Sequence, residues 1–250
     1  MVAVMSAVVG RTVLPRTVGG SNTGMTPVSS SSASRFDAAI VDLDGTMVDT
    51  IGDFEQSLGA MLVELGSAPL PRETVMRLIG KGSEHLVQSA LPLAGLAQQD
   101  PVAALAIYFR HYERINGRFS SVFPGVPEGL AALRASGLRL ACLTNKPLAF
   151  AVGLLEANGL ACYFEHVFGG DSFARKKPDP LPMQETCRAL GSEPSRTLAV
   201  GDSANDAQAA SAAGCAVALV GYGYNHGEPI RSVKADFYLD SLAELAPLLA

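Results

Sequence analysis

The spacing of apolar and polar residues divides this chain into segments of different predicted structure. Residues 36–44, FDAAIVDLD, form a mostly apolar run that predicts a buried strand. From about residue 52 to residue 121 the apolar residues recur at helical spacing, and no strand signal interrupts them. After residue 122 helix-like segments alternate with strand-like segments, which are predicted at 138–144, 166–168, 197–203, 216–221 and 235–240.

Strands and helices that alternate and are joined by short links predict an α/β fold, with a Rossmann-like parallel sheet covered by helices on both faces. The helical block is then an insertion directly after the first strand. We therefore expect a core formed by residues 35–51 and 122–250 and a helical cap formed by residues 52–121.

Residues 1–34 have a composition unlike the rest of the chain. They contain two arginines, no acidic residue and the run SSSSAS. This composition predicts a disordered N-terminal extension that the fold does not need. An organellar transit peptide would fit the same residues, as would a start codon placed too early, with Met25 as a later candidate.

Composition limits the classes of partner. With 250 residues, of which 48% are hydrophobic, the chain is long enough to bury a sizeable core. A net charge of −5 provides no general attraction for nucleic acid or an anionic membrane, and no stretch of about 18 or more apolar residues predicts a membrane span. We expect a small-molecule partner, no nucleic acid and no membrane, and a monomer or small homo-oligomer.

The cysteines indicate a reducing compartment. The chain has four of them, widely separated and without the spacing of a zinc site, and their small apolar neighbours predict buried, reduced thiols. The protein is therefore expected in the cytoplasm, with organellar targeting by residues 1–34 as the alternative. The histidines are predicted to be structural or exposed, and the aromatic stripe at residues 105–112 to serve helix packing.

Polar residues gather where the predicted strands end. In open α/β sheets the carboxyl ends of the strands face one crevice in which ligands bind. Carboxylates that are crowded there need a positive partner, so they are predicted to surround a divalent cation, while a nearby lysine and threonine hold an anionic group. The residues at these ends are Asp42 and Asp44, then Thr144, Asn145 and Lys146, then Lys177, and finally Asp202 and Asp206.

These strand ends resemble the four motifs of the haloacid dehalogenase superfamily of phosphohydrolases. The motifs here are DLDGT at 42–46, LTNKP with Thr144, KKPDP with Lys177, and GDSANDA at 201–207. All four occur in the family's order. The resemblance implies the fold of that superfamily and the hydrolysis of phosphate monoesters.

The resemblance also implies a role for each motif residue. Asp42 would be the nucleophile that forms an aspartyl phosphate, and Asp44 the acid that protonates the leaving group and then activates water. Thr144 and Lys177 would bind the transferring phosphoryl oxygens, although the neighbouring Lys176 remains an alternative to Lys177. Magnesium would be held by Asp42, the backbone carbonyl of Asp44, Asp202 and Asp206.

Two further segments are similar to segments of the bacterial phosphoglycolate phosphatases: residues 77–82, RLIGKG, and residues 222–230, YGYNHGEPI. They imply 2-phosphoglycolate as substrate. In that case the cap residues Lys81 and Arg77 would supply positive charge for its carboxylate. The other residues that the resemblance places at the substrate are Gly45, Thr46 and Asn145.

Other functions remain open at this point. A carbon–phosphorus hydrolase or a haloacid dehalogenase of the same superfamily typically lacks the second aspartate, so Asp44 favours ester cleavage. Another small-metabolite phosphatase or a sugar phosphomutase would keep both aspartates. A non-catalytic phosphate-binding protein would be free to lose Asp42 or Lys177, and both are present.

Overall fold

The computed structural model describes residues 35–249, so the predicted extension at residues 1–34 lies outside the described part of the chain. Its main feature is a six-stranded parallel sheet in the order β5-β4-β1-β6-β7-β8. The predicted α/β fold with a parallel sheet is confirmed. The strands are β1 (Ala38–Val41), β4 (Arg139–Leu143), β5 (His166–Phe168), β6 (Thr197–Gly201), β7 (Ala216–Val220) and β8 (Phe237–Leu239).

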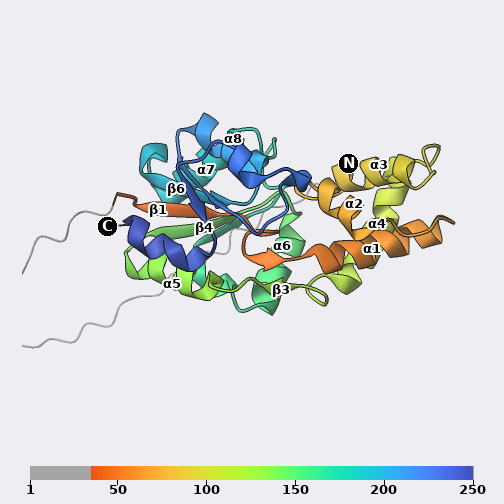
Figure 1. The fold of residues 1–250 in the computed structure, drawn as a ribbon, viewed down its shortest axis with the longest axis horizontal. Helices are drawn as coiled ribbons and strands as arrows, with labels where there is room; N and C mark the ends of the chain where they lie inside the picture. Colours follow the sequence, from red (N-terminus) through yellow and green to blue (C-terminus); the bar gives the residue numbers. More distant parts are fainter. Residues whose placement is uncertain (1–34, 250) are drawn as a thin grey trace, which may run out of the picture. The chain divides into compact units, whose positions relative to one another are not determined.

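Helices cover both faces of this sheet (Figure 1). Successive side chains of a strand point to opposite faces, so Ala39 and Val41 of β1 pack with α5 and α6, whereas Ala38 and Ile40 pack with α7 and α8. Because both faces are buried, the strands are apolar throughout, which is the pattern the sequence shows. The bounds are α5 (Val126–Ala135), α6 (Leu148–Ala157), α7 (Leu181–Leu190) and α8 (Ala204–Ala213).

The helices between residues 51 and 115 have a hydrophobic cluster of their own. It includes Leu58, Leu62, Leu86 and Tyr108, which are buried. Figure 1 shows these helices gathered beyond one end of the sheet. All described residues nevertheless belong to one compact unit, so the division into core and cap stays an interpretation. The helices are α1 (Ile51–Glu64), α2 (Arg72–Leu78), α3 (Ser83–Leu93) and α4 (Pro101–Ile115).

Several elements differ from the sequence-based expectations. β1 ends at Val41, before the aspartates, because the chain turns there and the amides of Met47 and Val48 bond back to the carbonyl of Leu43. A two-stranded antiparallel sheet, β2 (Val48–Asp49) with β3 (Ser121–Val122), was missed. Short 3₁₀ helices are η1 (Ala161–Tyr163), η2 (Pro194–Arg196), η3 (Asn225–Gly227), η4 (Ile230–Ser232) and η5 (Leu242–Leu249), the last replacing an expected α-helix.

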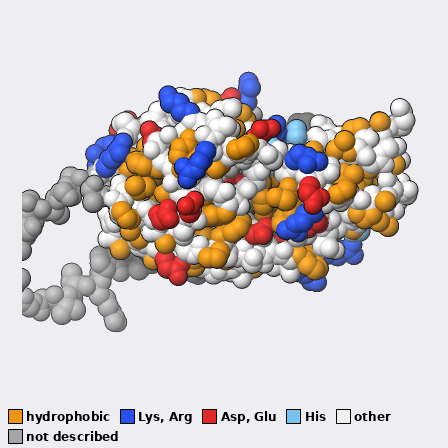
Figure 2. Space-filling model, in the orientation of Figure 1, with side chains coloured by type: hydrophobic (Ala, Val, Ile, Leu, Met, Phe, Trp, Pro, Cys, Tyr) orange, Lys and Arg blue, Asp and Glu red, His pale blue; other side chains and the backbone are white. Residues whose placement is uncertain are grey.

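The surface has no dominant charge on the face that Figure 2 shows, where acidic and basic side chains are mixed. Among residues 35–249, no helix has the length and apolar character that a membrane crossing requires. The prediction of buried thiols is confirmed for Cys142, Cys187 and Cys215 and is wrong for Cys162, which is exposed on the short helix η1.

Candidate active site

A small pocket lies where four neighbouring strands end and the helices of the inserted block face them. Its cavity volume is about 40 Å³, which is enough for a few water molecules. The strand ends of β4, β1, β6 and β7 are consecutive in the sheet, which is why their residues meet. The core supplies Asp42, Asp44, Thr144, Asn145, Lys146, Lys177, Asp202, Ser203, Asp206, Tyr224, Asn225 and His226, and the inserted block supplies Phe54, Ile79, Gly80, Gly82, Ser83, Leu86 and Tyr112.

Three carboxylates form a cluster in this pocket. Asp42, Asp202 and Asp206 each offer an oxygen, and these oxygens all lie within 4.8 Å of one another. Burial raises the pKa of Asp42 to about 7, against the opposing effect of the Lys177 ammonium. Burial, followed by the charges of Asp206 and Asp42, also raises the pKa of Asp202 well above its ordinary value. Ionising all three carboxylates together is therefore unfavourable without further positive charge.

Lys177 lies within hydrogen-bonding distance of two of these carboxylates. Its Nζ donates to Asp42 Oδ1 at 2.7 Å, to Asp206 Oδ1 at 2.6 Å and to the carbonyl of Leu143 at 2.8 Å. An ammonium has three N–H groups, so these contacts use all of them. Although burial alone would lower the pKa of Lys177, the Asp206 and Asp42 carboxylates raise it above its ordinary value, and the side chain stays charged.

Neighbouring backbone and hydroxyl groups orient Asp202. Its carboxylate accepts a hydrogen bond from the amide of Tyr224 at 2.7 Å and one from the hydroxyl of Thr46 at 3.2 Å. Two glycines pass close to this carboxylate. A Cβ on Gly45, which has a φ of +87°, would lie 2.4 Å from Asp202 Oδ2, and a Cβ on Gly223 would lie 2.3 Å from it. A side chain at either position would displace this carboxylate.

The start of α8 fixes Asp206. Ser203 is the N-cap residue, and its hydroxyl and amide donate to Asp206 Oδ2 at 2.6 Å and 3.2 Å. The Ser203 side chain in turn accepts from the backbone of Asp206, so the two residues form a capping box. The Asp206 carboxylate is thus held with one oxygen on Ser203 and the other on Lys177.

The pocket lining has the composition that a divalent cation requires. It contains four carboxylates and two lysines, which leaves two negative charges without a partner among the residues that line it. Carboxylate oxygens are hard ligands of the kind that magnesium prefers, and no histidine or cysteine belongs to the cluster. The residues present therefore fit a divalent metal ion. These groups are Asp42, Asp44, Asp202 and Asp206, with Lys146 and Lys177.

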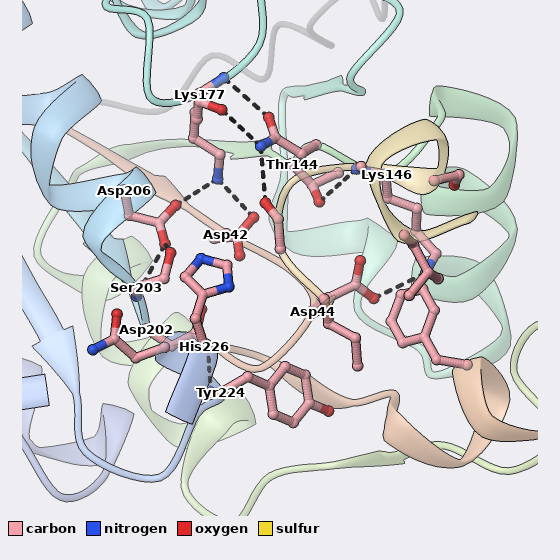
Figure 3. A pocket seen from close by; sticks show the side chains of 18 of the residues that line it. Asp42, Asp44, Thr144, Lys146, Lys177, Asp202, Ser203, Asp206, Tyr224 and His226 are labelled. Atoms are coloured by element: carbon pink, nitrogen blue, oxygen red, sulfur yellow. Dashed lines mark hydrogen bonds and ion pairs between the residues drawn. The ribbon is translucent and has the colours of Figure 1, made fainter. Parts of the chain in front are cut away.

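Asp44 faces a lysine that sequence reasoning named at a strand end but left without a role. Lys146 Nζ donates to Asp44 Oδ1 at 2.9 Å and also to the hydroxyl of Tyr112 on α4. It lies 4.8 Å from the ring centres of both Phe54 and Tyr112. Figure 3 shows Asp44 and Lys146 on one side of Asp42, with Lys177 and Asp206 on the other.

The residues predicted to bind substrate fall into separate groups. Thr144 and Asn145 line the pocket. Asn145 bridges three segments, because its side-chain amide donates to the carbonyls of Gly80 at 3.0 Å and Lys177 at 2.9 Å while its oxygen accepts from the amide of Lys177 at 3.0 Å. Gly45 and Thr46 do not line the pocket but surround Asp202.

Lys81 and Arg77, predicted to meet a substrate carboxylate, are both exposed and do not line the pocket. The glycines on either side of Lys81, Gly80 and Gly82, do line it. The backbone of this loop thus faces the pocket, whereas contact of the two basic side chains with a ligand remains a prediction.

The segment after β7 also reaches the pocket. Asn225 and His226 line it, both with positive φ, 27° and 56°. Burial, and to a lesser degree the charge of Lys81, lowers the pKa of His226, which favours the neutral ring at pH 7. The strand at 216–221 was predicted, and its carboxyl end places both residues at the same edge of the sheet, a signal that the resemblance of residues 222–230 alone did not use.

The chain is similar to known proteins over most of its length. The family model for haloacid dehalogenase-like hydrolases matches residues 36–214. A plasmid-encoded phosphoglycolate phosphatase of Cupriavidus necator is 48% identical over 213 residues, which cover 85% of this chain and 92% of that protein. The phosphoglycolate phosphatase of Nitrosospira multiformis is 46% identical over 215 residues, which cover 85% of this chain and 95% of that protein.

Solved structures give the same result. The crystal structure of a predicted phosphoglycolate phosphatase from Haemophilus somnus 129PT is similar with a TM-score of 0.78 at 33% identity, over 86% of this chain and 98% of that one. The region matched by the family model contains all four motifs, from Asp42 to Asp206. The chain belongs to the haloacid dehalogenase-like hydrolase family.

Proposed function

We propose that this chain is a magnesium-dependent phosphate monoester hydrolase that converts 2-phosphoglycolate into glycolate and phosphate. The observation that supports it most is the pairing of two aspartates in one small pocket, Asp42 against Lys177 and Asp44 against Lys146. Relatives with 36–48% identity that carry the name phosphoglycolate phosphatase support the choice of substrate.

In the first step an Asp42 carboxylate oxygen forms a bond to phosphorus while the bond from phosphorus to the ester oxygen breaks. The 2.7 Å contact with Lys177 favours the ionised, nucleophilic form of Asp42 and fixes its direction. This step requires the protonated form of Asp44, which donates its proton to the leaving ester oxygen, so that the leaving group departs as an alcohol. The hydroxyl of Thr144 would donate a hydrogen bond to a phosphoryl oxygen, and the positive charge of Lys177 would offset negative charge on the phosphoryl group.

In the second step Asp44, now ionised, takes a proton from water. The water oxygen bonds to phosphorus, the bond to Asp42 breaks, and inorganic phosphate leaves. A magnesium ion held by Asp42, Asp202, Asp206 and the backbone carbonyl of Asp44 would neutralise negative charge on the phosphoryl group. Thr46, Tyr224 and Ser203 serve this site by holding the carboxylates of Asp202 and Asp206 in place.

The size of the pocket supports a small leaving group. With a cavity volume of only about 40 Å³, the pocket has room for few atoms beyond the phosphoryl group. The same proposal has the protein act in the cytoplasm, without nucleic acid, as a monomer or small homo-oligomer. Buried, unpaired Cys142 is compatible with a reducing compartment.

A panel of phosphate monoesters tests the proposal. The purified full-length chain with magnesium should release phosphate from 2-phosphoglycolate with a higher kcat/KM than from sugar phosphates or nucleotides. Asp44→Asn should reduce turnover of alkyl phosphates more than that of p-nitrophenyl phosphate, whose leaving group needs no proton. A preference for another ester would refute the substrate, and isomerised sugar phosphate without net phosphate release would indicate a mutase instead.

A further inference from the structure

We infer that Lys146 binds the carboxylate of the leaving group, so that the pocket contains a subsite for a small anion directly beside Asp44. This inference rests on the proposed phosphatase function and deepens it, because it names the residue that would select an acidic two-carbon substrate. It also differs from the expectation that the exposed side chains of Lys81 and Arg77 provide this charge.

The ammonium of Lys146 is buried at the wall of the pocket. The side chain of Lys146 is only 2% exposed, and its Nζ lies 4.8 Å from the ring centres of both Phe54 and Tyr112. Of its three N–H groups, two have acceptors in the described part of the chain, Asp44 Oδ1 and the Tyr112 hydroxyl. One N–H thus remains for a ligand, at a position that lines the pocket.

The short chain of the proposed substrate fixes where its carboxylate can lie. In 2-phosphoglycolate a single methylene separates the ester oxygen from the carboxylate. If Asp44 donates a proton to that ester oxygen, the carboxylate must lie within a few bond lengths of Asp44. Lys146 Nζ, at 2.9 Å from Asp44 Oδ1, is at the distance required to meet it.

The other cations near the pocket are engaged elsewhere. Lys177 uses its three N–H groups on Asp42, Asp206 and a carbonyl, and burial lowers the pKa of His226 so that its ring is neutral. Lys176 pairs with Glu84 at 2.6 Å outside the pocket lining. Among the described residues that line the pocket, Lys146 is therefore the charged group suited to a carboxylate.

Substrates matched in size test the inference. Ethyl phosphate has the chain length of 2-phosphoglycolate, with a methyl group in place of the carboxylate. In Lys146→Met the ratio of kcat/KM for 2-phosphoglycolate to that for ethyl phosphate should fall by about 10- to 100-fold, as expected for loss of a hydrogen bond to a charged group. The control Lys176→Met removes a lysine that is about one-third exposed and lies outside the pocket lining, and its ratio should match that of the wild type.

A second measurement needs no variant. The wild-type protein should hydrolyse 2-phosphoglycolamide, in which a neutral amide replaces the carboxylate, with a kcat/KM about 10- to 100-fold below that for 2-phosphoglycolate. Equal values for the two would overturn the subsite, even if Lys146→Met did not fold.

The outcomes separate the two proposals. If the wild type does not hydrolyse 2-phosphoglycolate at all, the proposed function fails. If the wild type does so and Lys146→Met loses activity equally on both alkyl phosphates, the subsite is wrong and Lys146 only positions Asp44. If the ratio of kcat/KM for 2-phosphoglycolate to that for ethyl phosphate falls in Lys81→Met but not in Lys146→Met, the inference is also overturned. The carboxylate would then be assigned to the exposed side chain of Lys81.

Discussion

Lys177 lies among buried carboxylates, and its removal should reduce stability as well as activity. In Lys177→Met, Asp42 and Asp206 lose hydrogen bonds of 2.7 Å and 2.6 Å while both remain buried. Breaking a buried ion pair by removing one partner costs about 3–5 kcal/mol, because the remaining charge is uncompensated. We expect a decrease of this size in the free energy of unfolding for the metal-free protein at pH 8.

The effect should depend on pH in a defined direction. The pKa of Asp42 rises from 3.8 to about 7 on folding, so between these values the folded state binds more protons than the unfolded state. Stability of the metal-free protein therefore falls as pH increases through this window. Lys177 lowers the pKa of Asp42, so in its absence the window should extend further upward. The variant should consequently lose more stability at about pH 8 than at about pH 5.5.

Urea denaturation followed by circular dichroism, in buffer with a chelator, measures both effects. Lys176→Met is the matched control: this neighbouring lysine is about one-third exposed and pairs with a half-exposed glutamate. It should cost at most about 1 kcal/mol. A loss below about 1 kcal/mol in Lys177→Met, or an equal loss at both pH values, would contradict the picture of a buried carboxylate cluster held by one cation.

Two other predictions follow from the same contacts. Magnesium should raise the melting temperature of the wild type, and more at about pH 8 than at about pH 5.5, because the ligands must be deprotonated. In thermal melts of Asp202→Asn this shift should largely disappear, and an unchanged shift would exclude Asp202 as a ligand. Asn145→Ala should lower the free energy of unfolding in urea by about 1–3 kcal/mol, since the backbone groups of Gly80 and Lys177 lose their partner, whereas Asn158→Ala, which removes one local helix contact, should cost less.

The sequence predicted those features that depend on local pattern. In a parallel sheet each strand is buried on both faces, so the runs that became β1, β4, β6 and β7 could be recognised by apolar content alone. Because the carboxyl ends of such strands share an edge, Asp42, Thr144 and Asp202 could be expected to meet before any distance was known.

The features that escaped prediction depend on contacts between distant segments. Lys146 was visible at a strand end, but its contact with Tyr112 joins residues that are 34 positions apart, and the helical spacing of Tyr112 indicated only packing. Similarly, Thr46 belongs to the first motif, yet its hydroxyl bonds to Asp202, which is 156 positions away. β2 and β3 have only two residues each, too few to show an alternating pattern.

The central claim is that phosphoryl transfer passes through Asp42, and trapping the covalent intermediate tests it most directly. Asp44→Asn should slow the attack of water, so that the aspartyl phosphate accumulates during turnover of p-nitrophenyl phosphate. After acid quenching, reduction with borohydride converts an acyl phosphate into homoserine, which peptide mass spectrometry can locate. We predict homoserine at position 42 only in samples that received substrate. Its absence during measurable turnover, or its occurrence at another aspartate, would contradict the account.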